Sequence, residues 1–284
     1  MIPGPRLGPV AVGESRPRSA LTATGGFLRT FTHTLNPYFG CAFGCAFCYV
    51  RRSPAVLKIA SPWGRYVNVK RGFDRLLEDE LEAIEGRNGL GKLRVFMSSV
   101  TDPYQPVEAK TRISRRCLEA FARSPPQVLV VQTRSPLVLR DADLLTKLGR
   151  RVWVSFTVET DDERVRRAVT PATPPLSARF DAMRALLAAG VRVQAAVSPL
   201  LPHDPERFAD LLDGACTRVV VDTFVSGDGA GGRRTERTGI PEIYRALGYG
   251  SWDDEAPARA LHERLRSGLG PDRVVWSEDG FNAV

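Results

Sequence analysis

One short segment, residues 36–52, constrains this chain more than any other. It holds three of the five cysteines in a C-x3-C-x2-C spacing, at positions Cys41, Cys45 and Cys48. Pro37, Gly40 and Gly44 interrupt regular structure around them, so the segment must be a loop. Three converging thiolates repel one another unless a cation compensates their charge, and sulfur ligands select zinc, copper(I) or iron–sulfur clusters. The loop is therefore predicted to enclose a metal centre.

The number of available ligands distinguishes between these metals. A structural zinc site is closed by four ligands, usually arranged in two sequence pairs. The other cysteines, Cys117 and Cys216, stand alone, and the three histidines, His33, His203 and His262, are scattered. An iron–sulfur cluster with one open iron needs only three protein thiolates. The spacing favours such a cluster, with a zinc loop as the alternative.

The C-x3-C-x2-C spacing, with Phe47 just before the last cysteine, resembles the signature of radical S-adenosylmethionine (AdoMet) enzymes. The resemblance implies a [4Fe–4S] cluster whose free iron chelates the amino and carboxylate groups of AdoMet. It also implies that an electron from the cluster cleaves AdoMet to a 5′-deoxyadenosyl radical, which takes a hydrogen atom from a substrate. A partner such as flavodoxin or ferredoxin would supply that electron.

Short apolar strands alternate with amphipathic helices from about residue 29 onward. The strands are expected at Arg29–Leu35, Leu93–Val100, Val128–Thr133, Val152–Val158, Val191–Val197 and Arg218–Val225. The helices are expected at Phe73–Glu85, Arg112–Arg123, Leu137–Leu148, Leu176–Ala189 and Pro205–Leu212. The alternation indicates an α/β fold with a parallel sheet, either open or closed into a barrel. The resemblance implies a partial (β/α)6 TIM-like barrel with the cysteine loop after its first strand.

Three regions are expected along the chain. Residues 1–28 are rich in Pro, Gly, Ser and Thr and are interpreted as an extended basic arm. Residues 29–225 are assigned to the barrel, and residues 226–284 to a cap packed on it. The elements expected in the cap are a flexible link at Gly227–Gly232, helices near Pro241–Leu247 and Ala256–Ser267, and a strand at Arg273–Trp276.

The net charge of +8 is unevenly distributed. Residues 1–75 contain eleven Lys and Arg against two Asp and Glu, while the remainder is nearly neutral. This excess is either an electrostatic footprint for nucleic acid or a solvated face that reflects an arginine-rich composition. No apolar run has membrane-spanning length and no signal peptide is recognised, so we expect a cytoplasmic protein that does not enter a membrane.

Polar residues follow the second predicted strand, at the edge where parallel barrels place their active sites. They are Ser98, Ser99, Thr101 and Asp102. The resemblance implies that the amino group of AdoMet is held here, and a cationic amine needs such acceptors. The alternative is an ordinary turn opened by Asp102 and Pro103.

Further candidates follow the third and fourth strands. Arg134 suits the AdoMet carboxylate, unless it makes a surface salt bridge. Ser155, Thr157 and Glu159 share one face of their strand. Polar groups inside a barrel are costly unless they are used, and ribose hydroxyls would use them.

Aromatic residues complete the candidate site. Phe47 and Tyr49 flank the last cysteine and are expected to contact AdoMet. Tyr49 and Tyr104 are candidates for relaying a radical, provided that their hydroxyls reach the cavity.

Four motifs resemble the branch that contains spore photoproduct lyase and related "DNA repair photolyase"-type proteins. They are Asn36–Tyr49, Ser98–Gln105, Thr133–Asp141 and Val154–Glu159. The lyase uses a cysteine near the end of strand two as hydrogen-atom donor, where this chain carries Ser99, whose O–H bond is too strong for that role. Three hypotheses stay open: a radical enzyme acting on nucleic acid or a nucleotide, one acting on a peptide or small metabolite, and a non-catalytic metal-stabilised binding protein.

Overall fold

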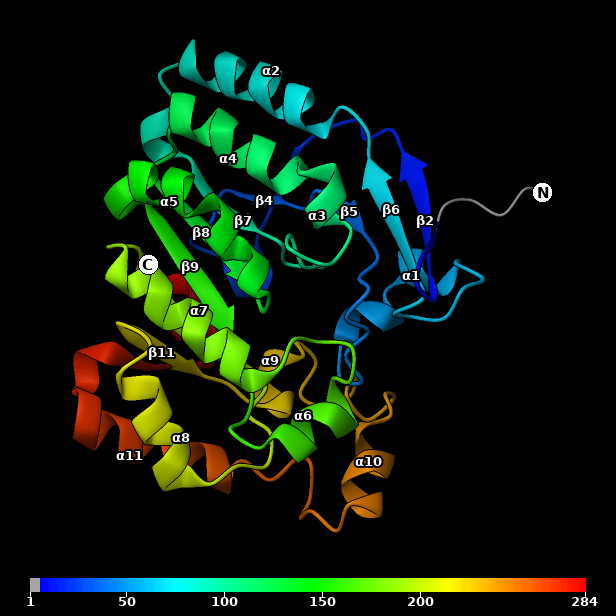
Figure 1. Ribbon diagram of the computed structural model, residues 1–284, viewed down its shortest axis with the longest axis vertical. Coiled ribbons are helices and arrows are strands. Elements are labelled where there is room, and N and C mark those ends of the chain that lie inside the picture. The colour runs from blue at the N-terminus through cyan, green and yellow to red at the C-terminus, as the bar shows by residue number, and fades with distance from the viewer. Residues whose placement is uncertain (1–5) are drawn as a thin grey trace.

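The computed structural model describes residues 6–284, so residues 1–5 of the expected arm lie outside the described residues. An eight-stranded sheet dominates it, in the order β12-β11-β10-β9-β8-β7-β4-β3. Its strands are β3 (Leu21–Ala23), β4 (His33–Leu35), β7 (Arg94–Met97), β8 (Val128–Thr133), β9 (Val152–Thr157), β10 (Arg192–Val197), β11 (Arg218–Val221) and β12 (Val274–Trp276). Every neighbouring pair is parallel except β3 with β4. The predicted parallel α/β sheet is confirmed, and it stays open (Figure 1).

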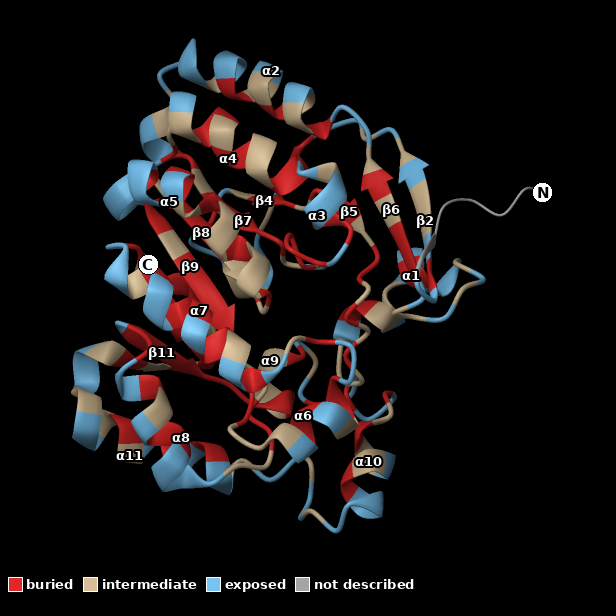
Figure 2. Ribbon diagram, in the orientation of Figure 1, coloured by how far each residue is buried: buried red, intermediate tan, exposed pale blue. Residues whose placement is uncertain are grey.

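Helices cover the outer face of this sheet (Figure 1). They are α2 (Phe73–Glu85), α4 (Ile113–Arg123), α5 (Ala142–Leu148), α7 (Leu176–Ala188), α8 (Pro205–Asp213) and α11 (Ala256–Leu269). In α2, Leu77 and Leu81 are buried because residues four apart share one face of a helix. Figure 2 shows the same division in the other helices, with a buried stripe toward the sheet and an exposed face outward. The predicted helix 137–148 differs in starting as the 3-10 helix η4 (Pro136–Asp141).

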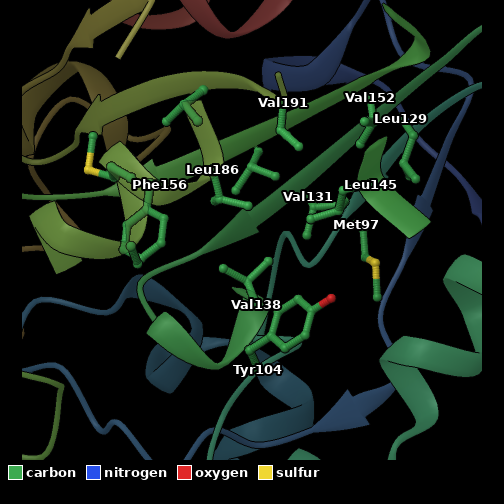
Figure 3. Close-up of a cluster of buried hydrophobic side chains, with 14 of the residues drawn as sticks. Met97, Tyr104, Leu129, Val131, Val138, Leu145, Val152, Phe156, Leu186 and Val191 are labelled. Carbon is green, nitrogen blue, oxygen red and sulfur yellow. The ribbon is translucent and has the colours of Figure 1, made fainter. Parts of the chain in front are cut away.

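Apolar side chains between the helices and the sheet form the main core (Figure 3). Val131 of β8, Phe156 of β9 and Leu186 of α7 are fully buried in it. Burial of one side chain of this size contributes about 1.5–3 kcal/mol. This layer therefore holds the strands, and the loops at their carboxyl ends, in fixed relative positions.

A second, small sheet flanks the cysteine segment. Its strands, in spatial order, are β1 (Arg6–Leu7), β2 (Val10–Ser15), β6 (Tyr66–Lys70) and β5 (Tyr38–Phe39). The described part of the expected arm is extended, but it is paired rather than free, because β2 runs parallel to β6 and β3 pairs with β4.

Segments next to the two edge strands of the large sheet contact each other. The 3-10 helix η1 (Gly26–Leu28) follows β3, and α12 (Ser277–Asn282) follows β12. The side-chain amide of Asn282 donates to the carbonyl of Phe27 at 2.6 Å and accepts from the N–H of Thr30 at 3.0 Å. Because β12 pairs with β11, the predicted cap (residues 226–284) adds a strand to the large sheet as well as packing against it.

Shorter helices surround the carboxyl edge of the sheet. They are α1 (Pro54–Leu57), α3 (Glu108–Thr111), α6 (Glu163–Val169), α9 (Phe224–Gly227) and α10 (Ile240–Ala246). Among the described residues, none of the helices combines the length and the hydropathy that a membrane span requires.

Candidate active site

The cysteine loop leaves β5 and follows a path fixed by two close backbone approaches. Gly40 has a φ of 85°, and a Cβ on it would lie 2.6 Å from the carbonyl oxygen of Tyr66. Gly44 has a φ of 55°, and a Cβ on it would lie 2.9 Å from the Cα of Gly64. Only glycine tolerates both the left-handed backbone and the lack of space. These two glycines therefore set the course on which the cysteines lie.

The segment after β7 holds this loop from the other side. The side-chain oxygen of Gln105 accepts the N–H of Ala42 at 2.9 Å, and its amide donates to the carbonyl of Gly40 at 3.3 Å. The hydroxyl of Thr101 donates to the same carbonyl at 2.7 Å. Thr101, expected to contact AdoMet, thus lines the cavity while also bracing the cysteine loop.

Cys41, Cys45 and Cys48 are free thiols that line one cavity of about 440 Å³. Burial raises the pKa of all three thiols, that of Cys45 to about 12, so binding as thiolates requires a cation in the cavity. Over residues 6–284, no three His, Cys, Asp or Glu side chains are arranged to hold a single metal ion. A cluster needs a wider arrangement, because each thiolate binds a different iron. The donor set of three thiols fits a [4Fe–4S] cluster.

Arg134, directly after β8, lies beside these thiols. Its Nη1 donates to Cys45 Sγ at 3.0 Å and to Glu159 Oε1 at 2.5 Å. The guanidinium lies 5.8 Å from the ring centre of Phe47. With only 14% of its side chain exposed, Arg134 makes no surface salt bridge but presents a cation to the cavity. Such a cation attracts carboxylates strongly.

Glu159 lies behind Arg134, outside the cavity lining. It is 1% exposed and also pairs with Arg179, which is fully buried, at 2.8 Å. Burial alone would raise the pKa of Glu159, but attraction to Arg134 and Arg179 outweighs it and lowers that pKa. The structure therefore places Glu159 outside the cavity lining, where it pairs with Arg134 and orients it.

Asp102 is buried and satisfied by neighbouring protein groups. Its carboxylate accepts the N–H of Arg134 at 3.0 Å, the N–H of Tyr104 at 2.9 Å and the hydroxyl of Thr133 at 2.8 Å. Burial nevertheless raises the pKa of Asp102. This carboxylate fixes the ends of two strands against each other and lines the cavity.

Ser98 contributes to the lining a hydroxyl that has no partner among the described residues. It is 3% exposed with a φ of 76°, and within the described residues its hydroxyl makes no hydrogen bond. An unsatisfied buried hydroxyl costs about 1–3 kcal/mol. The neighbouring Ser99 also lines the cavity, and its hydroxyl accepts from the Asn36 amide at 3.4 Å.

The end of β9 contributes Thr157 but not Ser155 to the cavity. The hydroxyl of Thr157 accepts from the Gln132 amide at 2.5 Å, and the side-chain oxygen of Gln132 has no partner in the described part of the chain. Ser155 is fully buried and accepts from Gln194 at 3.0 Å. Gln132 therefore contributes to the lining while its side-chain oxygen is left without a partner in the described part of the chain.

The two tyrosines differ in their access to the cavity. Tyr49 lines it and donates to the carbonyl of Ser99 at 3.1 Å. Tyr104 is fully buried outside the lining, with its hydroxyl 2.9 Å from Asp141. Cys117 is buried in α4, and the thiol of Cys216 lies 3.2 Å from the carbonyl of Leu212, so neither thiol lies in the lining.

The sequence analysis missed the residues that complete the cavity at the ends of β10 and β11. We call this set the Asp222 wall: Ser198, Asp222, Thr223 and Arg234. Asp222 is fully buried, accepting from the Ser198 hydroxyl and the Thr223 N–H, both at 2.9 Å. Burial raises the pKa of Asp222, and no arginine or lysine of residues 6–284 pairs with it. The sequence analysis predicted a strand over residues 218–225 and so placed Asp222 inside it. The strand β11 ends earlier, at Val221, and Asp222 therefore lies at its carboxyl end.

The segment Gly227–Gly232, expected to be a flexible link, folds around Asp228. The carboxylate accepts four backbone N–H groups at 2.7–3.0 Å, those of Ala230, Gly232, Arg234 and Thr235. This turn brings the guanidinium of Arg234 to 5.9 Å from the ring centre of Tyr49, at the edge of the cavity. The signal in the sequence is an aspartate that opens a glycine-rich turn.

Comparisons with known proteins agree with this geometry. The Radical SAM superfamily model matches residues 35–214. The uncharacterized protein MJ0683 of Methanocaldococcus jannaschii is 29% identical over 170 residues, which are 60% of this chain and 61% of that protein. The radical SAM Nalpha-GlyT isomerase of Pseudomonas phage M6 is 25% identical over 261 residues, covering 86% of this chain and 45% of the isomerase. The matches therefore span less than two thirds of either relative.

Among solved structures, a spore photoproduct lyase variant with bound AdoMet and dinucleoside spore photoproduct superposes with a TM-score of 0.64. The superposition covers 95% of this chain and 81% of the lyase, at 15% identity. At that identity the likeness shows the fold, which is the predicted partial barrel with an open sheet. With the family model spanning the cysteine loop and most of the parallel sheet, the chain belongs to the radical SAM superfamily and is an enzyme of that class.

Proposed function

We propose that Cys41, Cys45 and Cys48 bind a [4Fe–4S] cluster and that AdoMet binds beside it in the cavity of about 440 Å³. One observation carries the proposal: three free thiols share a cavity with Arg134, whose Nη1 lies 3.0 Å from Cys45 Sγ. When bound, the cluster supplies the electron that cleaves AdoMet, and so provides the 5′-deoxyadenosyl radical for hydrogen abstraction. A carrier such as flavodoxin or ferredoxin delivers that electron.

The lining residues suit the functional groups of AdoMet. Arg134 holds the carboxylate, with its orientation kept by the buried Glu159. The free hydroxyl of Ser98 accepts from the amino group, which relieves the cost of leaving it unsatisfied. The hydroxyl of Thr157 and the unpartnered side-chain oxygen of Gln132 would accept the ribose hydroxyls, because both residues belong to the cavity lining.

The substrate we propose is a nucleic acid or a nucleotide. The excess positive charge of the chain supports this class, as does the presence of a dinucleoside in the similarly folded lyase. Action on a peptide or small metabolite is the alternative that the experiment separates.

The test measures hydrogen transfer. Protein reconstituted with iron and sulfide under anaerobic conditions is given reductant, AdoMet and deuterated DNA, RNA, nucleotides or peptides in separate reactions. Deuterium in the 5′-deoxyadenosine from a nucleic acid or nucleotide supports the proposal. Deuterium transfer from a peptide alone selects the alternative.

The same reaction reports how AdoMet is used. Recycling of AdoMet in the manner of spore photoproduct lyase needs a protein thiol beside the substrate, and in the described chain the thiols of the lining are Cys41, Cys45 and Cys48. We therefore expect AdoMet to be consumed, with about one 5′-deoxyadenosine released per product. Many products per AdoMet cleaved would contradict this and would require another hydrogen donor.

A further inference from the structure

Exposed arginines adjoin Arg234, which belongs to the cavity lining. Arg52 of η2 (Tyr49–Arg52) and Arg233, Arg234 and Arg237 of the turn after Asp228 are exposed. In the described chain none of the four is ion-paired, and Glu236 is the only acidic residue of the segment 229–238. The guanidinium of Arg52 donates to the carbonyl of Arg237, so the two segments form one continuous rim. We call these four residues the arginine rim.

The arginine rim is held in place and carries an aromatic face. The carboxylate of Asp228 fixes the backbone of the turn, and Arg234 donates to the carbonyl of Asp228 at 2.9 Å. Tyr49 is 38% exposed, lines the cavity and lies under Arg234. Cations along a groove, together with an aromatic on which bases stack, are the elements that bind single-stranded nucleic acid.

Inside the rim, the buried carboxylate of Asp222 offers hydrogen-bond acceptors. Asp222 has no cation partner among the described residues, and the groups that donate to it are the hydroxyls of Ser198 and Ser277 and the N–H of Thr223. A buried carboxylate without a cation is stabilised by further N–H donors. The base of a nucleotide presents such donors, and its phosphates suit the rim outside.

We propose that the Asp222 wall and the arginine rim form a subsite for one unpaired nucleotide of a polynucleotide. Asp222 binds N–H donors of the base, Tyr49 stacks, and the rim binds the flanking phosphates. The inference rests on the proposed function, because the nucleotide must lie beside AdoMet. Four unpaired arginines exceed what a single phosphate needs, so the ligand is a polyanion. A base inside a duplex cannot enter a cavity, so the nucleotide is unpaired.

The test is equilibrium binding, followed by fluorescence anisotropy. The reconstituted full-length protein is titrated into labelled single strands of about 16 nucleotides, made of each base in turn as DNA and as RNA, at several salt concentrations. Replacing Arg234→Glu and Arg237→Glu together removes at least two phosphate contacts. The slope of log affinity against log salt should therefore flatten by about 1.4.

The matched control is the double variant Arg16→Glu/Arg18→Glu. It makes the same change of charge at two exposed residues that are not ion-paired in the described chain and lie outside the cavity lining, between β2 and β3. Its salt slope should flatten less than that of the rim variant, because Arg16 and Arg18 lie outside the cavity lining. If the rim variant unfolds at a lower temperature, Arg233→Glu/Arg237→Glu replaces it, because neither of these side chains makes a hydrogen bond among the described residues.

Asp222→Asn tests the interior of the subsite. It keeps the size of the side chain while removing the charged acceptor, so the ratio of the tightest to the weakest base should fall about tenfold, with an unchanged salt slope. The proposal is overturned if no single strand binds, if the rim variant keeps the wild-type slope, if duplex binds as tightly as single strands, or if Asp222→Asn keeps the base preference. If the wild type cleaves AdoMet but gives any of these binding results, the nucleotide subsite is wrong and the proposed function stands. If the protein binds no iron, the proposed function itself is wrong.

Discussion

Two buried carboxylates show how differently the two sides of the cavity are built. Glu159 follows β9 and is held between Arg134 and Arg179, so its pKa is lowered despite burial. Asp222 follows β11 with no such cation, and burial raises its pKa. The first carboxylate is neutralised by two protein cations, whereas the second accepts hydrogen bonds but has no cation partner among the described residues. The charges on the cysteine side are therefore paired before any ligand binds. On the other side, the carboxylate of Asp222 has no cation opposite it in the described chain.

The organisation of the cysteine side extends from the loop to the strand ends. Gln105 and Thr101 brace the loop, and Asp102 holds the backbone of Arg134. Groups locked in this way act without reorganising when charge develops nearby. Variants of Glu159, Ser98 and Asp222 test whether the two sides of the cavity differ in this way.

The largest effect is expected from Glu159→Ala, which leaves two buried arginines unpaired. Removing one partner of a buried ion pair costs about 3–5 kcal/mol, so the free energy of unfolding in denaturant should fall by that amount. Glu206→Ala breaks an exposed pair with Arg264 and is the control, with a much smaller loss expected. Equal losses of free energy of unfolding in the two variants would show that the buried ion pairs of Glu159 stabilise the protein no more than an exposed pair does.

Ser98→Ala should act in the opposite direction on stability. Removing a buried hydroxyl without a partner raises the free energy of unfolding of the ligand-free protein by about 1 kcal/mol. The same change should weaken AdoMet binding, measured by calorimetry, because an acceptor is lost. Ser99→Ala, at a hydroxyl already bonded to Asn36, is the matched control and should not stabilise. Stabilisation without any loss of AdoMet affinity would remove Ser98 from the proposed AdoMet contacts.

The smallest effect is a difference in pH dependence between the two carboxylates. The pKa of Asp222 is raised above 3.8, so its stabilising contribution is present below that pH and is lost as pH rises through the folded pKa. Asn mimics the protonated acid, so Asp222→Asn should gain stability relative to the wild type as the pH rises above 3.8. The negative charge of the nearby Glu255 carboxylate also raises the pKa of Asp222.

Glu159→Gln should show the reverse trend. The pKa of Glu159 is lowered below 4.5, so its contribution is present above that pH and is lost as pH falls through the folded pKa. The variant should therefore lose stability relative to the wild type as pH rises. Parallel pH profiles for the two variants, from denaturant unfolding, would contradict the contrast between the two sides.

The sequence predicts the cysteine side of the molecule better than the Asp222 wall, for physical reasons. The cysteine spacing and the strand–helix alternation are local patterns, and both appear in the structure. Apolar residues continue on both sides of Asp222, with Val219, Val220 and Val221 before it and Phe224 and Val225 after it. The sequence pattern therefore does not indicate that the strand ends at Val221.

Two further features depend on contacts that no local pattern contains. The glycines after Asp228 indicate flexibility by themselves, yet four N–H groups converge on one carboxylate and order the turn. The pairing of β12 with β11 joins residues more than fifty positions apart. Periodicity predicts the strand at 274–276 but not the sheet that it enters.

Reductive cleavage of AdoMet by the reconstituted wild type and its cysteine variants tests the central claim most directly. We expect 5′-deoxyadenosine and bound iron with the wild type, neither with Cys41→Ala, Cys45→Ala or Cys48→Ala, and both with Cys117→Ala and Cys216→Ala. Those two controls change buried thiols outside the cavity lining. Substantial cleavage by Cys45→Ala, or tightly bound zinc without iron in protein made anaerobically with ample iron, would contradict it.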